Sequence, residues 1–459
     1  MRVLSLLIHF FASFSVCVGL GTANSAGANI DLSGDPSFDY SAGAALASNA
    51  SAWYSAYTST CLAHAPWRDA LSAYSALHAR ALAALRNSSG SAVEPRPSLS
   101  VYRIPRRRSI IGLGCLLPGL SNVFLSALKR GRVFLLDWPG SEPVFAVPEW
   151  LPGVRSPWKP LAKALGADRT SAHYKGFAAG YNTAATVSGV RAPALWGAIP
   201  ADDPVDVETH WIFNRGAYTH MGAQTEEEFR WLATVLPRDA SGSTLWGCVY
   251  AAVVPLTPAL LARSDAVPLP APPLPPAQQR RDAPPALVCL HVRTWALEPV
   301  PTDAPPAESK YVRAAFECLE KVLVESNASR ATTTVYVASD DVEVRALARV
   351  RFGADFTVAT ATDEPAQIAF INEEDDDARA EEITLGSWAE WARLVRCPVL
   401  VGTAYSGYAR SAGAAGARSA LYFYDEDALG PNTGSGGKAC VRRQDGAERE
   451  LTKGFGAGW

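Results

Sequence analysis

The sequence predicts an α/β protein of two domains, each built around a parallel sheet. A chain of 459 residues exceeds what a single hydrophobic core normally supports, which favours two domains. Between residues 286 and 424, short apolar runs rich in β-branched residues alternate with longer segments of helical period. The hydrophobic content of 48% and the 13 tryptophans predict a folded body.

The chain begins with an apolar run from Val3 to Leu20. Its length of about 18 residues approaches that of a membrane-spanning helix, while the small residues after it offer cleavage sites for a signal peptide. We therefore interpret residues 1–28 as a signal peptide or a single-pass signal anchor. The rest of the chain, soluble or type II anchored, is then expected in the lumen of the Golgi or endoplasmic reticulum. Asn-x-Ser sequons at Asn49, Asn87 and Asn327 are compatible with this compartment.

Residues 29–95 are predicted to form a stem and an N-terminal helix. Ser, Ala and Gly dominate the first part of this segment, without a clear period. The helix is indicated by apolar residues at helical spacing from Pro66 to Leu85, and it should end at Asn87-Ser88-Ser89-Gly90.

The first α/β domain is predicted at residues 96–263. Ser109 to Ile111, a glycine turn at Gly112-Leu113-Gly114 with an apolar stretch behind it, and the run Arg132 to Asp137 indicate strand, turn, helix and strand. From residue 139 to 260 the sequence predicts only mixed helices and loops.

Residues 264–285 form a proline-rich segment, interpreted as an interdomain linker or a surface insertion because its prolines exclude helix and central strand. The second domain, residues 286–459, is expected to contain a doubly wound parallel sheet, which binds ligands at the carboxyl ends of its strands. The predicted strands cover residues 286–292, 333–338, 356–359, 399–401 and 420–424. The predicted helices cover residues 309–325, 342–350 and 388–396, with a short one after Ser406.

Eight cysteines occur in the chain, and Cys17 lies in the apolar N-terminal run. Seven remain, so at least one is expected to stay free or to pair between chains. No Cys-x-x-Cys spacing occurs, which argues against a structural zinc site. Cys289 and Cys397 lie in apolar, strand-like runs and are interpreted as buried free thiols.

Composition and motifs exclude several function classes. The formal net charge of −3 gives no field that favours a nucleic acid partner. Gly112-x-Gly114 fails the dinucleotide fingerprint, and Gly119 is not followed by Lys, which excludes a P-loop. The acidic run Glu373 to Asp377 is interpreted as a solvated loop, not a cation site. The basic run Arg106 to Arg108 is interpreted as a surface patch.

Polar groups follow three predicted strands of the second domain, where a ligand of such a sheet would bind. They are His291-Val292-Arg293-Thr294, Ser339-Asp340-Asp341, and the run from Thr403 to Arg410. Alternation places His291 and Arg293 on one face, and an Arg side chain suits a diphosphate because its planar fork donates two charge-assisted hydrogen bonds. Carboxylates can accept from guanine, and hydroxyls with helix-start amides suit phosphate.

Each of these groups also has a structural interpretation. A His-x-Arg pair on a strand is usually structural, and Asp-Asp before a helix is often an N-cap. Thr and Ser at a strand-to-helix turn cap helices routinely. The argument for a site therefore rests on their occurrence together.

The runs Val288 to Arg293, Val335 to Asp341 and Val399 to Arg410 resemble, in order and spacing, three motifs of the α1,6-, α1,2- and protein O-fucosyltransferase superfamily. Gly112-Leu113-Gly114 and the strand before Asp137 are similar to the opening glycine loop and following strand of that superfamily. The resemblance implies a GT-B-like fold, two Rossmann-like domains facing a cleft. It also implies GDP-fucose as donor in the second domain, a glycan or protein hydroxyl as acceptor, and inversion without a metal cofactor.

Carried over by position, the resemblance assigns roles to the strand-end residues. Arg293 would hold the diphosphate of GDP and act in catalysis, and carboxylates of Asp340 and Asp341 with His291 would contact the donor, mainly its nucleoside. The phosphate and sugar pocket would be completed by Thr403, Ser406, Arg410, Gly112 and Gly114.

The sequence departs from the pattern at several positions. Thr294 and Ala296 stand where members with the α1,6 pattern have a second Arg and an acidic residue, and Cys115 stands where Asn is common. No catalytic base matches, so Glu298 and Asp303 are named as the nearest candidates. Fucosyl transfer has an oxocarbenium-like transition state, in which stabilisation of the leaving group dominates.

Two other functions remain open on the sequence. The altered first motif also fits a lumenal nucleotide- or carbohydrate-binding protein of the same fold that has lost transfer. A transferase that uses another sugar nucleotide is the second alternative. Turnover of GDP-fucose separates the first from an enzyme, and competition among GDP- and UDP-sugars separates the second.

Overall fold

The computed structural model describes twelve segments of the chain. They are residues 61–87, 97–103, 113–165, 205–209, 234–235, 242–270, 284–294, 310–361, 377–403, 406–415, 420–424 and 440–442. The predicted signal segment, the first part of the stem, Gly112, Glu298 and Asp303 lie outside them. Within these segments, no helix has the length and apolar character needed to cross a membrane.

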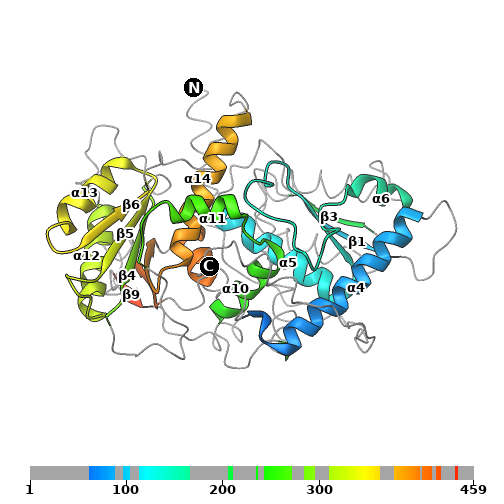
Figure 1. Cartoon of the computed structure of the whole chain (residues 1–459), viewed down its shortest axis with the longest axis horizontal. Helices are drawn as coiled ribbons and strands as arrows, with labels where there is room; N and C mark the ends of the chain where they lie inside the picture. The colour runs from blue at the N-terminus through cyan, green and yellow to red at the C-terminus, as the bar shows by residue number, and fades with distance from the viewer. Residues whose placement is uncertain are drawn as a thin grey trace, which may run out of the picture.

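Two sheets organise the described residues (Figure 1). The first sheet is parallel, with β1 (Leu99–Arg103) between β2 (Val133–Asp137) and β3 (Val205–Thr209). The second has the order β6-β5-β4-β7-β8-β9 and is parallel except for β9, which is antiparallel to β8. Its strands are β4 (Leu287–Val292), β5 (Thr334–Ser339), β6 (Thr357–Thr360), β7 (Val399–Thr403), β8 (Ala420–Tyr424) and β9 (Val441–Arg442). The prediction of an α/β protein with parallel sheets is confirmed.

Helices of the first half of the chain follow their apolar spacing. In α4 (Ala65–Asn87) the buried residues recur every three or four positions, from Trp67 through Leu71 and Tyr74 to Leu82 and Leu85. The predicted helix and its end at Asn87 are confirmed. The others in this half are α5 (Leu113–Arg130), α6 (Trp158–Ala164), α10 (Gly242–Val253) and α11 (Pro258–Asp265).

The strand expected before α5 differs from the one observed. The predicted strand Ser109 to Ile111 lies outside the described residues, and β1, which pairs with β2, occupies Leu99–Arg103.

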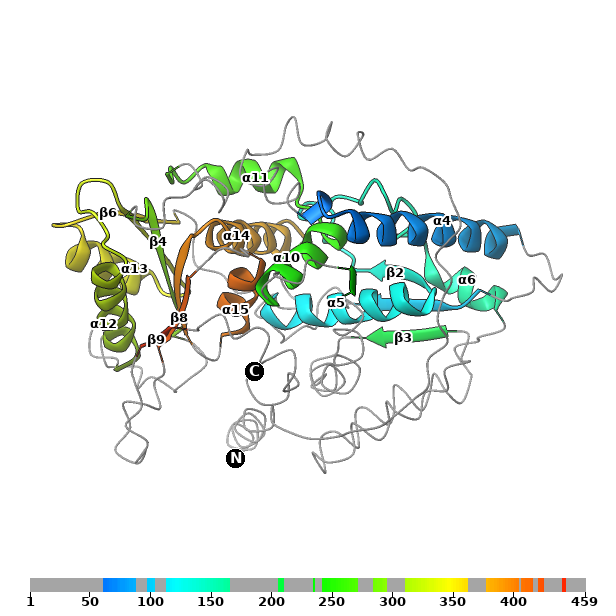
Figure 2. The ribbon, with the colours of Figure 1, turned by 90° about the horizontal axis from the view of Figure 1, so that it is seen from below.

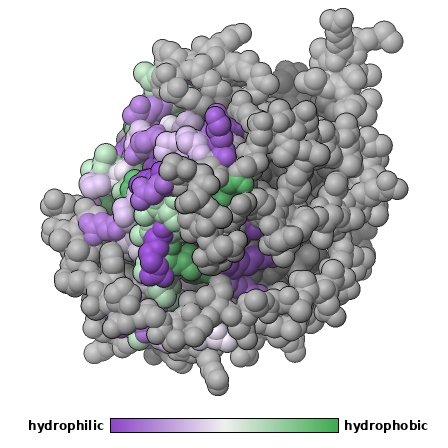
Figure 3. All heavy atoms as spheres, turned by 90° about the vertical axis from the view of Figure 1, so that its right-hand side faces the viewer, coloured by the Kyte–Doolittle hydropathy of each residue, from purple (hydrophilic) through white to green (hydrophobic). Residues whose placement is uncertain are grey.

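At the end of the molecule where α4 and α6 lie, the described side chains mix hydrophilic and hydrophobic kinds (Figure 3).

In the second half, helices cover both faces of the six-stranded sheet. Helices α12 (Lys310–Glu325) and α13 (Val342–Phe352) pack on the face that carries Val288, Leu290 and Val337. Helices α14 (Asp377–Val395) and α15 (Gly407–Ala415) pack on the opposite face. This is the layering of a doubly wound fold.

Helix α14 begins well before the predicted start at Trp388. Its first turns project from the body (Figure 1), and among their described side chains only Ile383 is buried before the segment around Trp388. Because so few of these positions are apolar and buried, the helical period is weak in the sequence. An ion pair between Glu382 and Arg263 of α11 holds this part of the helix.

One hydrophobic core reaches from the first sheet to the second. Figure 2 shows α10, α14 and α15 between the two sheets. The ring of Trp388 on α14 lies 4.5 Å from that of Phe145 and 6.1 Å from that of Trp138, centroid to centroid. Trp391 meets Tyr250 of α10 at 6.4 Å, and α15 packs against α5 and α10. The halves of the chain are therefore joined by apolar packing.

Part of the predicted linker belongs to this packing. Ser264 and Val267 are buried, and the carbonyl oxygens of Arg263 and Ser264 accept hydrogen bonds from the fully buried Arg393 of α14, at 2.6 and 2.9 Å. Residues 271–283, which contain half of the prolines of this segment, lie outside the described residues.

Three disulfides join distant parts of the chain: Cys61–Cys248, Cys289–Cys397 and Cys318–Cys440. The interpretation of Cys289 and Cys397 as free thiols is wrong. Strands β4 and β7 are neighbours, with Val288 opposite Val399, which brings the two Cα atoms to 5.9 Å. Their separation of 108 residues left no local signal in the sequence. Cys115, the seventh cysteine outside the apolar run, lies in α5.

Candidate functional site

The three predicted strand ends meet at one edge of the second sheet. β4 lies between β5 and β7, with His291 opposite Ala338 on one side and Gly402 on the other. From β4 the chain adds β5 and β6 on one side, then returns to add β7 on the other. The boundary between β4 and β7 is therefore a topological switch point, where open α/β sheets bind their ligands.

Arg293 follows β4 at this switch point. Its backbone N–H donates to Oγ1 of Thr403, the last residue of β7, at 3.3 Å. Thr403 is buried, whereas Arg293 is partly exposed. The backbone of Arg293 is thus hydrogen-bonded to the neighbouring strand β7.

Thr294 ties the same turn to β5. Its N–H and its hydroxyl both donate to Oδ1 of Asp340, each at 2.9 Å. The turn that carries Arg293 is therefore held from both sides. This role of Thr294 was not predicted from the sequence, because the resemblance marks the position only by the absence of a second Arg. The signal was a hydroxyl after one strand and a carboxylate after the next.

Asp341 performs the capping role that its position suggested. Its Oδ1 accepts from the N–H of Glu343 at 2.8 Å, and its own N–H donates to Ser339 Oγ at 3.2 Å. The two carboxylates of the Asp-Asp pair therefore have different contacts. Asp340 faces the turn after β4, and Asp341 begins α13.

His291 is only 6% exposed and lies against Tyr408 of α15, with ring centroids 5.2 Å apart and the planes tilted by 34°. Burial, with the positive charge of Arg293 adding to it, lowers the pKa of His291 to about 3. The imidazole is therefore neutral at physiological pH and does not add a positive charge to the site.

Tyr408 is fixed from α14, because its hydroxyl donates to the carbonyl oxygen of Ser387 at 2.5 Å. Burial raises the pKa of this phenol well above its usual value, and nearby Glu390 and Tyr336 raise it further. Tyr408 therefore stays protonated and serves as a wall of the site.

The start of α15 closes the edge of the site beside β7. Ser406 is buried, its N–H donates to the carbonyl oxygen of Thr403 at 3.0 Å, and its Oγ accepts from the N–H of Ala409 at 3.4 Å. Arg410 lies in the first turns of this helix. Gly114 lies in the first turn of α5, which packs against α15.

The fold thus brings several predicted site residues together in space. Three adjacent strand ends contribute His291, Arg293, Asp340, Thr403 and Ser406. Hydrogen bonds link Arg293 to Thr403, Thr294 to Asp340 and Ser406 to Thr403. Among the described residues, no group of three or more His, Cys, Asp or Glu could hold a metal ion. An arginine side chain and the amides of a helix start are both groups that suit an anionic phosphate.

No family model and no curated protein matches the chain. Among solved structures, the chain is similar in fold to a mutant of Arabidopsis thaliana FUT1 in complex with GDP. The two sequences are 15% identical, the match covers 86% of this chain and 82% of that chain, and the TM-score is 0.46. It is also similar to NodZ α-1,6-fucosyltransferase soaked with GDP-fucose, with 12% identity, 76% and 100% covered, and a TM-score of 0.42. For NodZ from Bradyrhizobium the values are 14% identity, 69% and 92% covered, and a TM-score of 0.37.

Proposed function

We propose that this protein is a glycosyltransferase that moves fucose from GDP-fucose to a hydroxyl of a glycan or protein, with inversion. One observation carries the proposal: the turn bearing Arg293 is held between Thr403 of β7 and Asp340 of β5, at the switch point of a parallel sheet. The order and spacing of the three strand-end motifs, which resemble those of fucosyltransferases, support the choice of donor.

In this proposal Arg293 and the amides at the start of α15 hold the diphosphate, with Arg410 beside them. The acceptor oxygen forms a bond to the anomeric carbon as the bond from that carbon to the β-phosphate oxygen breaks. The electron pair leaves with GDP, where Arg293 stabilises the added negative charge. The hydroxyl proton passes to a carboxylate, for which Glu298 and Asp303 are the candidates. The acceptor binds on the side of the first sheet, across a cleft from the donor.

Substitution Arg293→Ala tests the site. A charge-assisted hydrogen bond contributes about 1.5–3 kcal/mol, so we expect GDP affinity measured by titration calorimetry to fall about 10- to 100-fold. Arg351→Ala is the matched control, because Arg351 is a half-exposed arginine of α13 that pairs with Glu320 on the surface. Equal GDP affinity in Arg293→Ala and the parent would refute the assignment.

Turnover separates the proposed enzyme from the alternatives. Release of GDP from GDP-fucose in the presence of acceptor glycans is expected, and competition by GDP-mannose and UDP-sugars ranks the donors. GDP-fucose binding without turnover would favour a nucleotide-binding protein, and stronger binding of a UDP-sugar would favour another donor. We also propose that no metal cofactor is needed, so transfer should persist in EDTA.

We further propose that the protein works in the lumen of the secretory pathway. The three disulfides are typical of oxidising compartments, and the apolar run Val3 to Leu20 provides the targeting signal. The sequon at Asn327 is exposed, in a left-handed turn after α12. Expression in a eukaryotic cell should give a glycosidase-sensitive band, and Asn327→Gln should shift it. An unglycosylated, protease-accessible product in microsomes would contradict this location.

A further inference from the structure

A buried ion pair lies beneath the candidate site. Arg345 of α13 and Glu390 of α14 are 2.8 Å apart, and their side chains are 6% and 15% exposed. Neither residue belongs to the motifs that suggested the site. The pair is distinct from the surface pair of Arg351 and Glu320, which also involves α13 but is about half exposed.

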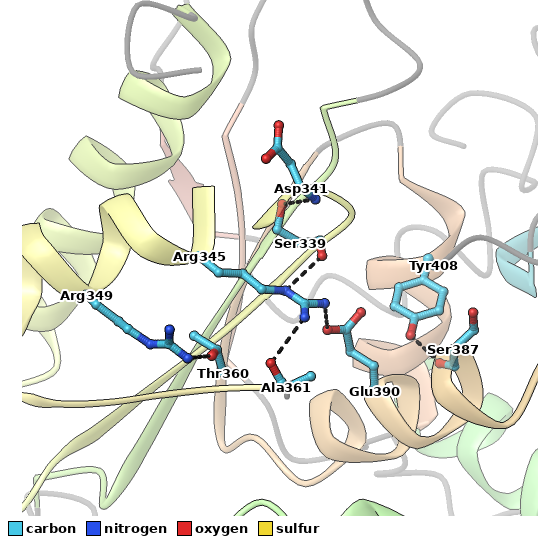
Figure 4. A network of polar contacts seen from close by, with 9 residues as sticks. All are labelled: Ser339, Asp341, Arg345, Arg349, Thr360, Ala361, Ser387, Glu390 and Tyr408. Carbon is cyan, nitrogen blue, oxygen red and sulfur yellow. Dashed lines mark hydrogen bonds and ion pairs between the residues drawn. The ribbon is translucent and has the colours of Figure 1, made fainter. Parts of the chain in front are cut away.

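The Arg345 guanidinium makes three hydrogen bonds that the structure defines, which end at β5, just after β6 and at α14 (Figure 4). Its Nε donates to the carbonyl oxygen of Ser339, at the end of β5, at 3.1 Å. One terminal nitrogen donates to the carbonyl oxygen of Ala361, just after β6, at 3.2 Å, and the other to Glu390 at 2.8 Å. The planar fork of arginine thus fixes two strand ends relative to α14.

The strand end held by Arg345 leads directly to the turn of the site. Ser339 precedes Asp340, and Oδ1 of Asp340 accepts both hydrogen bonds from Thr294, the neighbour of Arg293. A displacement of Ser339 therefore moves the acceptor that holds this turn.

Helix α14 supports the other side of the site as well. The carbonyl oxygen of Ser387, three positions before Glu390, accepts a hydrogen bond from the hydroxyl of Tyr408 (Figure 4). The ring of Tyr408 lies against His291. One turn of α14 thus contacts both Arg345, which holds the end of β5, and Tyr408, which packs on His291 of β4.

We propose that Arg345 and Glu390 are positioning residues of the donor site, which hold the turn bearing Arg293 in place through Ser339 and Asp340. The assignment of this turn to the diphosphate of GDP rests on the proposed function. Such a pair contributes little net stability, because desolvation of two charges offsets much of their attraction. Its contacts are directional, and one of them ends at Ser339, the residue before Asp340.

Substitution Glu390→Gln tests the proposal, with Glu320→Gln as the control on the surface pair of α13. Hydrogen exchange measured by mass spectrometry reports the amides of Arg293 and Thr294, whose hydrogen bonds define the turn. We expect their exchange to accelerate in Glu390→Gln and to be unchanged in Glu320→Gln. Unchanged exchange in Glu390→Gln would overturn the proposal.

The ratio of GDP to GMP affinity, measured by calorimetry, distinguishes positioning from general loss of stability. A misplaced Arg293 weakens binding of the diphosphate, so GDP affinity should fall on the order of tenfold while GMP affinity changes little. Equal loss for both nucleotides would contradict the proposal. Arg345→Lys, which keeps the charge but loses the fork, should behave in the same direction and serves if Glu390→Gln does not fold.

Asp340→Asn completes the series, because Glu390 is argued to act through Asp340. The effects of Glu390→Gln and Asp340→Asn on GDP affinity should be less than additive. Additive effects would overturn the proposed route. If the parent protein binds no GDP, the proposed function fails, and the exchange measurement alone then decides whether Arg345 and Glu390 support the turn.

Discussion

His291 shows how much the surroundings of a residue decide about its role. Its place beside Arg293 suggested a second donor contact, and the structure buries it against Tyr408. The buried imidazole is neutral and packs against Tyr408 of α15. Its titration should therefore be visible in stability.

We expect His291 to make the protein less stable in acid. Its pKa is about 3 when folded and 6.5 as the ordinary value, so the unfolded chain binds a proton in this window that the folded protein does not. The free energy of unfolding should fall as pH drops below 6.5, by at most about 1.4 kcal/mol per pH unit. In His291→Asn, the free energy of unfolding measured with urea should lack this decrease between pH 7 and 5. Above pH 7 it should differ from that of the parent by a constant amount. Equal pH slopes in the two proteins would disprove it.

Asp341 can be tested for a role beyond its cap. Asp341→Ala removes the acceptor for the N–H of Glu343 and should cost about 1 kcal/mol of stability, as N-cap losses do. Because the carboxylate contacts the backbone of its own helix, GDP affinity should stay within about twofold of the parent. A larger loss of affinity would support the donor contact that the resemblance implies for Asp341.

Site residues could be predicted from the sequence where they follow a predictable strand end. Arg293, Asp340 and Thr403 were expected near one another because the carboxyl ends of parallel strands share one edge, and their hydrogen bonds fulfil that geometry. Arg345 and Glu390 were not predictable, because no local pattern links a residue of α13 with one of α14.

At the level of elements, the predictions were best where burial is strongest. The strands β4, β5 and β7 are buried along their whole length, and their apolar runs gave bounds close to those observed. Helix α14 was predicted too short because its first turns are exposed and depend on a contact with α11. Tertiary contacts of this kind have no period in the sequence.

Among the contacts between elements, those of Trp388 are expected to contribute most to the free energy of unfolding. It is fully buried, and its ring packs on Phe145 and Trp138 of the first half of the chain. Trp388→Ala should lower the free energy of unfolding by about 3–5 kcal/mol, measured with urea. Val350→Ala, at a position 83% exposed, should change it by less than about 0.5 kcal/mol. Similar small changes in both variants would contradict the shared core.

At the scale of the whole molecule, the shared core predicts cooperative unfolding. Aromatic contacts across α14 and the bonds from Arg393 to α11 join the two sheets, so neither half keeps its core when the other unfolds. Scanning calorimetry should show one transition, with calorimetric and van't Hoff enthalpies in a ratio near 1. Two separate transitions would show that the halves are independent domains.

The order of the three disulfides along the chain determines which pieces a protease can release. The loops closed by Cys289–Cys397 and Cys318–Cys440 interleave, so one cut anywhere between these outermost cysteines leaves the fragments covalently joined. Cys61–Cys248 ends before both loops begin. A cut among the prolines of residues 271–283 therefore yields fragments that migrate separately on a denaturing gel even without a reducing agent. A cut between residues 361 and 377 becomes visible only once the cystines are reduced.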